Sequence, residues 1–151
     1  MRLVPAERSH IPLIAMRDAD KRECGAFGHS PGAALENALR GSLWALTAMA
    51  GDEPVAMLGV TPLSMVEGVG VPWMLGSDRI YDSSRALIRL VPPVIAEMHE
   101  TFPQLENYVS TDNARAMAFL RHFDFELSGD VRIVGGVPFQ RFTRCAIPSL
   151  A

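Results

Sequence analysis

The chain has 151 residues, of which 48% are hydrophobic and 21% are charged, and its formal net charge is −3. This composition excludes an intrinsically disordered chain, and the slightly negative charge disfavours a nucleic-acid-binding protein. The two cysteines give neither a disulfide framework nor a metal-ligand pattern, and no apolar run reaches the length of a membrane span. We therefore expect one domain over residues 1–151, in the cytoplasm, without a membrane, a nucleic acid or a metal as partner.

The first elements predicted in chain order are a short strand and helical segments. Arg2–Val4 is the strand candidate. Between residues 9 and 24, apolar positions recur at helical spacing, which predicts an amphipathic helix or a pair of helices. Ser30 and Pro31 suit the N-cap and first position of a further helix, which Gly41 closes.

Three strands are predicted next. The apolar runs 43–50 and 54–60 are joined by Gly51, Asp52 and Glu53, which is typical of a hairpin. A third apolar run, 68–76, predicts a buried strand.

A long helix is predicted from Ser83 or Ser84 to about Thr101. Pro92 and Pro93 fall inside it. Because proline lacks a backbone N–H and its ring clashes with the preceding turn, we expect the helix to kink or restart there.

Shorter elements complete the chain. A strand is predicted at 107–110, a helix at 113–123, and strands at 125–127, 131–134 and 137–146. The predicted order is β-α-α-β-β-β-α-β-α-β-β, which gives an α+β fold with a mixed central sheet flanked by helices.

The stretch Asn113–Phe125 has a pattern of its own. Its Asn113, Ala116, Phe119 and Phe125 resemble a motif of the GNAT (GCN5-related N-acetyltransferase) superfamily, in which an Asn precedes a helix and Gly-Phe leads into the next strand. Asp124 stands where that family usually has Gly. The whole predicted element order also resembles the GNAT order.

A second resemblance covers nearly the whole length. The chain is similar to a phage-encoded, GNAT-like family that includes the internal virion protein of T7-like phages and related prophage proteins. The stretches that carry this resemblance are Arg17–Asp20, Gly59–Val60, Pro72–Asp78, Leu105–Val109 and Asn113–Phe125. It implies phage structural proteins as partners and a place in the host cytoplasm or the virion.

The GNAT resemblance implies an N-acetyltransferase that uses acetyl-CoA and a small-molecule or protein amine. The family holds the cofactor's pyrophosphate on a glycine-rich helix start, yet residues 77–85 contain no Gly. Arg79 and Arg85 favour an anion there, whereas Asp78 and Asp82 oppose one, so a modified cofactor site and an ordinary capped helix both stay open. The expected cofactor contacts are Trp73, Met74, Leu75, Arg79, Ser83, Ser84, Arg85 and Asn113.

The catalytic groups are not fixed by the sequence. Many GNAT enzymes place a Tyr proton donor where this chain has Leu120, and leucine cannot donate a proton. The candidate general bases are Glu67, Asp78, Asp82 and His122. No spacing selects one of them, so the general acid and base stay unknown.

Two polar features have a structural and a functional interpretation. Asn113 either caps the helix after it or contacts the cofactor, and we favour the cap. Arg17, Asp20 and Glu23 share a helical face, and we favour a solvated, salt-bridged face over a substrate-reading one.

Three functions therefore stay open. The first is an acyl-CoA-dependent N-acetyltransferase of unknown acceptor. The alternatives are a catalytically silent GNAT-fold virion or assembly protein, and a module that binds CoA without turnover. Whether the chain is a monomer or a homodimer is also open.

Overall fold

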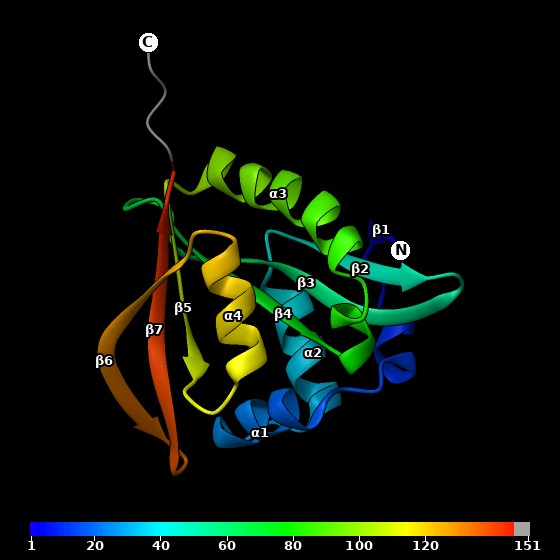
Figure 1. Ribbon diagram of the computed structural model, residues 1–151, viewed down its shortest axis with the longest axis horizontal. Helices are drawn as coiled ribbons and strands as arrows, with labels where there is room; N and C mark the ends of the chain where they lie inside the picture. Colours follow the sequence, from blue (N-terminus) through cyan, green and yellow to red (C-terminus); the bar gives the residue numbers. More distant parts are fainter. Residues whose placement is uncertain (147–151) are drawn as a thin grey trace.

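The computed structural model describes residues 1–146, which form one seven-stranded sheet (Figure 1). Its strands are β1 (Arg2–Pro5), β2 (Trp44–Ala50), β3 (Glu53–Ser64), β4 (Val69–Gly76), β5 (Gln104–Ser110), β6 (Glu126–Val134) and β7 (Val137–Cys145). Their order is β1-β2-β3-β4-β5-β7-β6, with β4 and β5 parallel and every other pair antiparallel. The predicted mixed sheet is confirmed.

Helices cover both faces of this sheet. They are η1 (Arg8–Leu13), α1 (Asp18–Ala26), α2 (Pro31–Gly41), η2 (Asp78–Tyr81), α3 (Ser84–Thr101) and α4 (Ala114–His122). In Figure 1, α3 and α4 lie in front of the sheet and α2 lies behind it. The predicted element order is confirmed, with short 3-10 turns added at η1 and η2.

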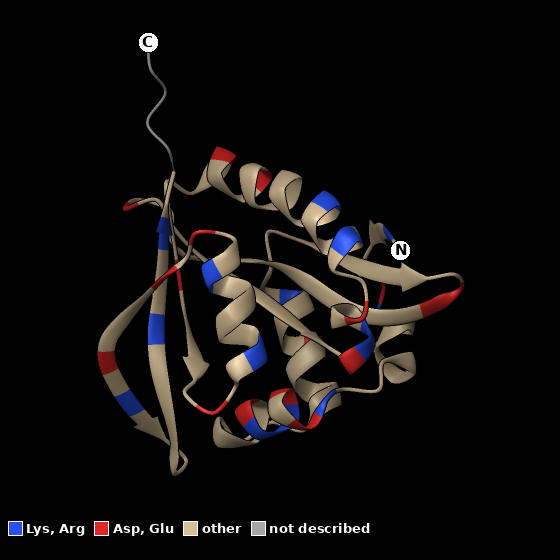
Figure 2. Ribbon diagram, in the orientation of Figure 1, with Lys and Arg blue, Asp and Glu red and all other residues tan. Residues whose placement is uncertain are grey.

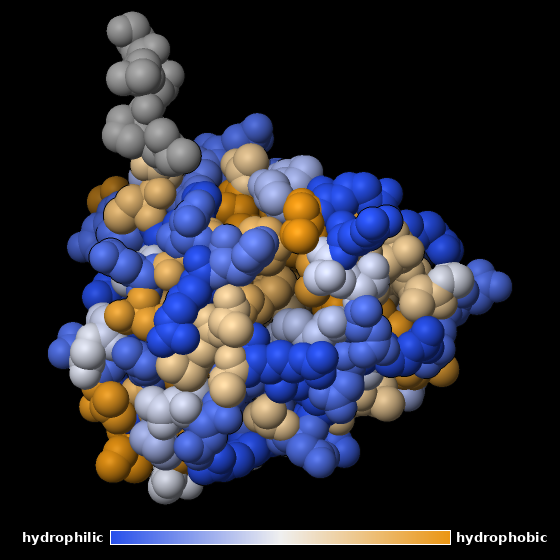
Figure 3. Space-filling view, viewed as in Figure 1, coloured by the Kyte–Doolittle hydropathy of each residue, from blue (hydrophilic) through white to orange (hydrophobic). Residues whose placement is uncertain are grey.

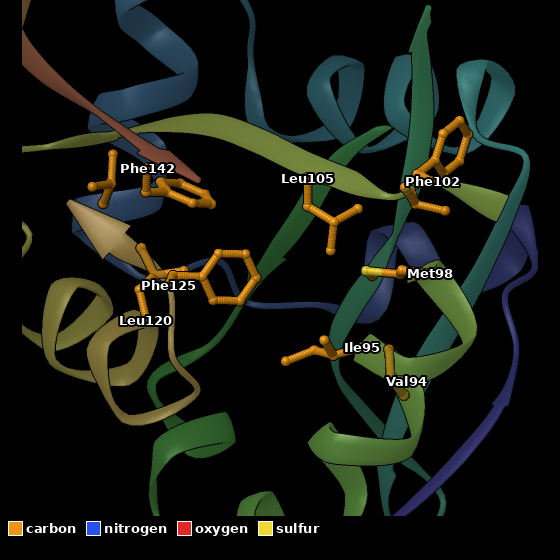
Figure 4. Close-up of a cluster of buried hydrophobic side chains, with 10 residues drawn as sticks. Val94, Ile95, Met98, Phe102, Leu105, Leu120, Phe125 and Phe142 are labelled. Atoms are coloured by element: carbon orange, nitrogen blue, oxygen red, sulfur yellow. The ribbon is translucent and has the colours of Figure 1, made fainter. Parts of the chain in front are cut away.

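Alternation along the strands divides the core into two layers. Trp73 and Leu75 of β4 pack on the side of α1 and α2, together with Leu35. Met74, between them, faces the opposite side, where α3 and α4 pack. Figure 4 shows part of that second layer, with side chains from α3, α4, β5 and β7 and with Phe125, the residue just before β6.

The N-terminal helical region is a pair of elements rather than one helix. A 3-10 helix, η1, contains Pro12, and α1 starts only at Asp18. Between them the chain is extended at Ile14 and Arg17, and the Arg17 N–H donates to the Gly76 carbonyl at 2.8 Å. That bond to β4 explains why the helical pattern is interrupted.

A kink or a restart of the long helix was expected at Pro92 and Pro93, and a restart does not occur. α3 runs from Ser84 to Thr101 through both prolines. The carbonyls that lose a partner are those of Ile88 and Arg89, four residues earlier, on the exposed side of the helix where water can bind them. Solvation therefore limits the cost of the missing donors.

Some strand boundaries differ from expectation. β5 begins at Gln104 rather than at residue 107, and β3 extends to Ser64. The strand candidates 125–127 and 131–134 are two halves of β6, because the pairing with β7 shifts register between Leu127 and Val131.

No helix within residues 1–146 combines the length and the hydrophobicity that a bilayer crossing requires.

Candidate functional site

The sheet opens between β4 and β5. These parallel strands pair only at Val69 with Gln104 and at Gly70 with Leu105, where both strands begin. Two residues further along, the side chain of Asn107 reaches across and donates to the Pro72 carbonyl at 2.8 Å. Beyond this point no strand pairing joins β4 to β5, so their carboxyl ends diverge.

A continuous cavity of about 400 Å³ occupies this gap. On one side of the sheet it is lined by side chains of α1 and α2, and on the other by those of α3 and α4. Figure 3 shows apolar side chains gathered in the hollow between α3 and α4. Its size is that of a small-molecule site, which typically measures about 300–1,000 Å³.

Two carboxylates of α1 hold the ends of the diverging strands. Asp20 accepts a hydrogen bond of 3.0 Å from the Gly76 N–H at the end of β4. Glu23, one turn further along, accepts one of 2.9 Å from the Ser110 N–H at the end of β5. We call Arg17, Asp20 and Glu23 the α1 bridge, because they span the open end of the gap.

Asn113 and Arg17 complete this network. The Arg17 guanidinium lies 3.4 Å from the Asp20 carboxylate and donates to the Asn113 side chain at 3.2 Å. The Asn113 amide donates in turn to Glu23 at 3.0 Å. Arg17 and Asp20 are only 9% and 6% exposed, so the expectation of a solvated face is wrong for them. Figure 2 shows that α1 as a whole carries charges of both signs. Those of Arg17 and Asp20 are buried in the protein.

The Asp20 carboxyl and the Cys24 thiol both line the cavity. Burial raises the pKa of Asp20 from 3.8 to about 6, although the Gly76 N–H and Arg17 oppose the change. A carboxyl with that pKa populates both protonation states near neutral pH and can accept a proton. Burial also raises the pKa of Cys24 to about 11, so its thiol stays protonated and is a poor nucleophile.

Tyr81, in η2, is a proton donor that lines the same cavity. Burial raises its pKa to about 12, which keeps the phenol protonated at neutral pH. The guanidinium groups of Arg17 and Arg115 lie 5.0 Å and 5.3 Å from its ring centroid, and Phe119 contacts its ring edge-on. These neighbours fix the ring beside the α1 bridge.

The structure divides the expected cofactor contacts into two groups. Trp73, Met74, Leu75 and Asn113 line the cavity. Trp73 also donates from its indole N–H to the Ser42 hydroxyl at 2.8 Å, which fixes its orientation.

The second group lies around the start of α3 and does not line the cavity. Its members are Arg79, Ser83, Ser84 and Arg85. Ser83 is the N-cap of α3 and accepts from the Ala86 N–H at 3.3 Å, while Arg79 pairs with Glu53. The first half of α3 carries arginine and its second half glutamate (Figure 2), while the exposed Asp78 and Asp82 lie just before the helix.

None of the four candidate bases lines the cavity. Glu67 is exposed in the turn before β4, and Gly76 lies at the other end of that strand. Asp78 has a 72% exposed side chain and lies 3.5 Å from the Arg17 Nε. Asp82 and His122 are both exposed. The carboxyls that do border the cavity belong to Asp20 and Glu23, which the sequence assigned to a solvated face.

The family-like stretch before β6 serves packing and capping. Asn113 is the N-cap of α4, since its side chain accepts from the Ala116 N–H at 3.3 Å. Leu120 is buried in the core at 8% exposure. Asp124 has a φ of 65°, in the left-handed region that glycine adopts most readily and that Asp tolerates. The residue differs from the usual glycine, but the backbone conformation is one that suits a glycine.

The fold is that of GNAT-family acetyltransferases. No protein-family model and no curated protein matches the sequence. A ribosomal-protein-alanine N-acetyltransferase from Brucella melitensis superposes with a TM-score of 0.68 at 17% identity, covering 97% of this chain and 100% of that one. A spermidine N-acetyltransferase from Vibrio cholerae, in complex with CoA and spermine, gives 0.67 at 10% identity over 95% and 94%. A GNAT-superfamily phosphinothricin acetyltransferase from Sinorhizobium meliloti, in complex with AcCoA, gives 0.65 at 12% over 95% and 87%. Identities this low show the fold alone.

Proposed function

We propose that the chain is an acyl-CoA-dependent N-acyltransferase that acts as one domain on an amine acceptor. The observation that carries the proposal is the cavity between β4 and β5, which passes through the sheet beside the α1 bridge. A cavity of this kind lets two substrates approach each other from opposite faces of the sheet. Fold similarity to acetyltransferases supports the same assignment.

Several groups suit an acyl-CoA. The backbone N–H and C=O of Met74 lie two residues before Gly76 and, by strand alternation, face the same open edge of β4. They can pair with the amides of a pantetheine arm, as the next strand of a sheet would. Arg79, Arg85 and the free amides at the start of α3 suit its phosphates. The bound molecule would supply an activated thioester carbonyl.

Other groups limit where that molecule can lie. Residues 77–83 contain no glycine, and the buried Ile80 fills the turn that a pyrophosphate loop would form. The N–H and C=O of Gly76 are already bound by Asp20 and Arg17. Phosphate binding would therefore rely on arginine side chains and the helix start rather than on a glycine cradle.

The site has groups for both proton transfers of a direct acyl transfer. The amine nitrogen attacks the thioester carbonyl carbon, the C–N bond forms, and the C–S bond breaks to release the thiolate. Asp20 accepts the proton that the amine loses, since its raised pKa suits a general base. Tyr81 donates its phenolic proton to the departing thiolate, and solvent reprotonates it. Arg17 positions both residues.

Two measurements test this proposal. Acetyl-CoA and CoA at millimolar concentration are expected to raise the melting temperature, because a ligand that binds only the folded chain stabilises it. Release of free thiol from acetyl-CoA, followed over a panel of primary amines, then measures turnover. Asp20→Asn should lower turnover by about 100-fold while CoA binding persists. A melting temperature unchanged by both ligands would refute the proposal.

A second candidate is a GNAT-fold protein without chemistry that serves in a phage virion or its assembly. The α1 bridge favours it, because Asp20 and Arg17 occupy backbone groups of β4. The buried Leu120 and the glycine-free turn before α3 favour it too. Binding of CoA without thiol release from acetyl-CoA with any amine would support a silent protein. Its presence in purified phage particles would identify the virion role.

A further inference from the structure

The cavity has aromatic side chains on the side of α1 and α2. The bond from Asn107 to the Pro72 carbonyl keeps β4 and β5 in register, so the next residues, Trp73 and Tyr108, lie level with each other across the gap. Strand alternation turns both side chains toward α1 and α2, because the neighbouring Val109 packs on the side of α3 and α4. Both rings line the cavity.

Two phenylalanines extend this aromatic lining. Phe27, at the end of α1, and Phe139, on β7, also line the cavity, and their ring centroids are 5.3 Å apart. Phe139 is buried, whereas Phe27 is 52% exposed. The turn between β6 and β7 lies beside them, since a Cβ on Gly135 would lie 2.5 Å from the Ala26 carbonyl oxygen.

We call Phe27, Trp73, Tyr108 and Phe139 the aromatic mouth. Phe27 is exposed, and Trp73 and Tyr108 are partly exposed, so this part of the lining reaches solvent. A molecule bound there can extend out of the cavity and need not fit wholly inside it. An exposed phenylalanine at the edge of a cavity is also a contact that a ligand could cover.

The charged side chains that line the cavity are acidic. They are Asp20 and Glu23, and no lysine or arginine among residues 1–146 joins them in the lining. The Ser110 N–H and the Asn113 amide both donate to Glu23 Oε1, which leaves Oε2 to accept from a ligand. A lining of this charge attracts an ammonium group.

Two arginines lie near the lining without being part of it. Arg17 donates to Asn113 and lies 3.4 Å from Asp20. The exposed Arg132 lies 5.8 Å from the centroid of the Tyr108 ring. A carboxylate inside the cavity would therefore meet lining groups of its own charge, without a lining arginine or lysine to offset them.

These features distinguish between classes of amine. Aromatic faces attract both a cation and a second aromatic ring. An amino acid brings a carboxylate, which the acidic lining disfavours. A polyamine brings an aliphatic chain, which gains no ring-to-ring contact in the aromatic mouth.

We propose that the acceptor is a primary amine with an aromatic body and no carboxylate, whose ammonium binds Glu23 beside Asp20 and whose ring lies in the aromatic mouth. This inference rests on the proposed acyltransferase function and names its acceptor. The bound ammonium loses one proton to solvent, which frees the nitrogen lone pair. The acyl transfer to that nitrogen then follows the bond changes given above.

Titration calorimetry of the full chain with amines, in the presence of millimolar CoA, measures acceptor binding without turnover. The probes are 2-phenylethylamine, L-phenylalanine, ethylamine and spermidine. 2-Phenylethylamine should bind at least about tenfold more tightly than L-phenylalanine, which differs from it only by a carboxylate. It should also bind at least about tenfold more tightly than ethylamine, which lacks the ring.

Each other outcome refutes a defined part of the reasoning. Equal affinity for L-phenylalanine would overturn the recognition of charge. Affinity for ethylamine or spermidine that matches or exceeds that for 2-phenylethylamine would overturn the aromatic body, as would no binding of 2-phenylethylamine. Any of these results with CoA bound would leave the acyltransferase proposal standing. Failure of both CoA and acetyl-CoA to bind would overturn that proposal itself, whichever amine binds.

Two variants locate the acceptor. Phe27→Ala should weaken binding of 2-phenylethylamine at least about fivefold and leave CoA affinity unchanged. Leu63→Ala is the matched control, since Leu63 is 61% exposed and does not line the cavity, and it should change neither affinity. Glu23→Gln removes the charge and should lower the preference for 2-phenylethylamine over L-phenylalanine at least about threefold. Unchanged amine affinity in folded Phe27→Ala would overturn the aromatic mouth as the site, and an unchanged preference in Glu23→Gln would overturn the role of this carboxylate.

Discussion

The charge of Asp20 should make the stability of the chain depend on pH. Its pKa is about 6 in the folded chain against an ordinary value of 3.8, so the folded chain binds this proton more tightly than the unfolded chain does. The contribution to stability is full below pH 3.8 and is lost as pH rises through about 6. The difference between the two pKa values corresponds to about 3 kcal/mol, at about 1.4 kcal/mol for each tenfold change in proton affinity.

The variant Asp20→Asn isolates this contribution. Asparagine keeps an oxygen that can accept from the Gly76 N–H, but it does not titrate. The free energy of unfolding, measured with urea from about pH 4 to about pH 7, should fall in wild type relative to the variant by about 2.4 kcal/mol, because part of the contribution is already lost at pH 4. Asp18→Asn is the matched control, since Asp18 is exposed on the same helix, and its difference from wild type should stay constant. A difference between wild type and Asp20→Asn that does not change with pH would refute the burial of this carboxylate.

Three further variants probe the site. Tyr81→Phe should lower turnover by about 100-fold with little change in the affinity for acyl-CoA, because only the proton donor is lost; a normal rate would exclude Tyr81 as the acid. Arg17→Met should reduce the free energy of unfolding by about 3 kcal/mol in urea, since it leaves Asp20 buried without its cation. Gly76→Ala should destabilise the chain by about 2 kcal/mol in the same assay, because its Cβ would lie 2.4 Å from a side-chain carbon of β3. Gly129→Ala, where nothing lies within 4 Å, should be nearly neutral, and equal effects of the two glycine changes would contradict the close approach.

Local chemistry was sufficient to predict the starts of α2, α3 and α4. Ser30, Ser83 and Asn113 are each N-caps whose side chains accept a backbone N–H three residues on. Each cap and the N–H that it accepts lie within one helical turn, so the local sequence is enough to identify the cap. Pro92 and Pro93 in α3 show where local reasoning fails. The sequence predicts that each proline destabilises the helix, but it does not show that the carbonyls left without a donor face solvent.

The site was harder to predict, since its parts come from separate elements. The spacing of Arg17, Asp20 and Glu23 indicates a shared helical face, but it does not say what covers that face. The partners of the α1 bridge, Gly76 and Ser110, are backbone groups at strand ends and leave no mark in the sequence. Tyr81 likewise gains its surroundings from α1 and α4. Burial by tertiary packing is what converts these ordinary residues into a candidate site.

The α1 bridge also restricts how far β4 and β5 can move apart. The two parts of the sheet, β1–β4 and β5–β7, are joined by backbone pairing only where Val69 and Gly70 meet β5. At the other end of these strands, the side chains of Asp20 and Glu23 bind one strand each. A ligand that pushes the two parts of the sheet apart must break the hydrogen bonds of Asp20 and Glu23 to the strand ends. A ligand that enters beside the α1 bridge leaves both bonds intact. Hydrogen exchange at the amides of Gly76 and Ser110 reports which of these occurs, because each amide is protected only while its carboxylate holds it.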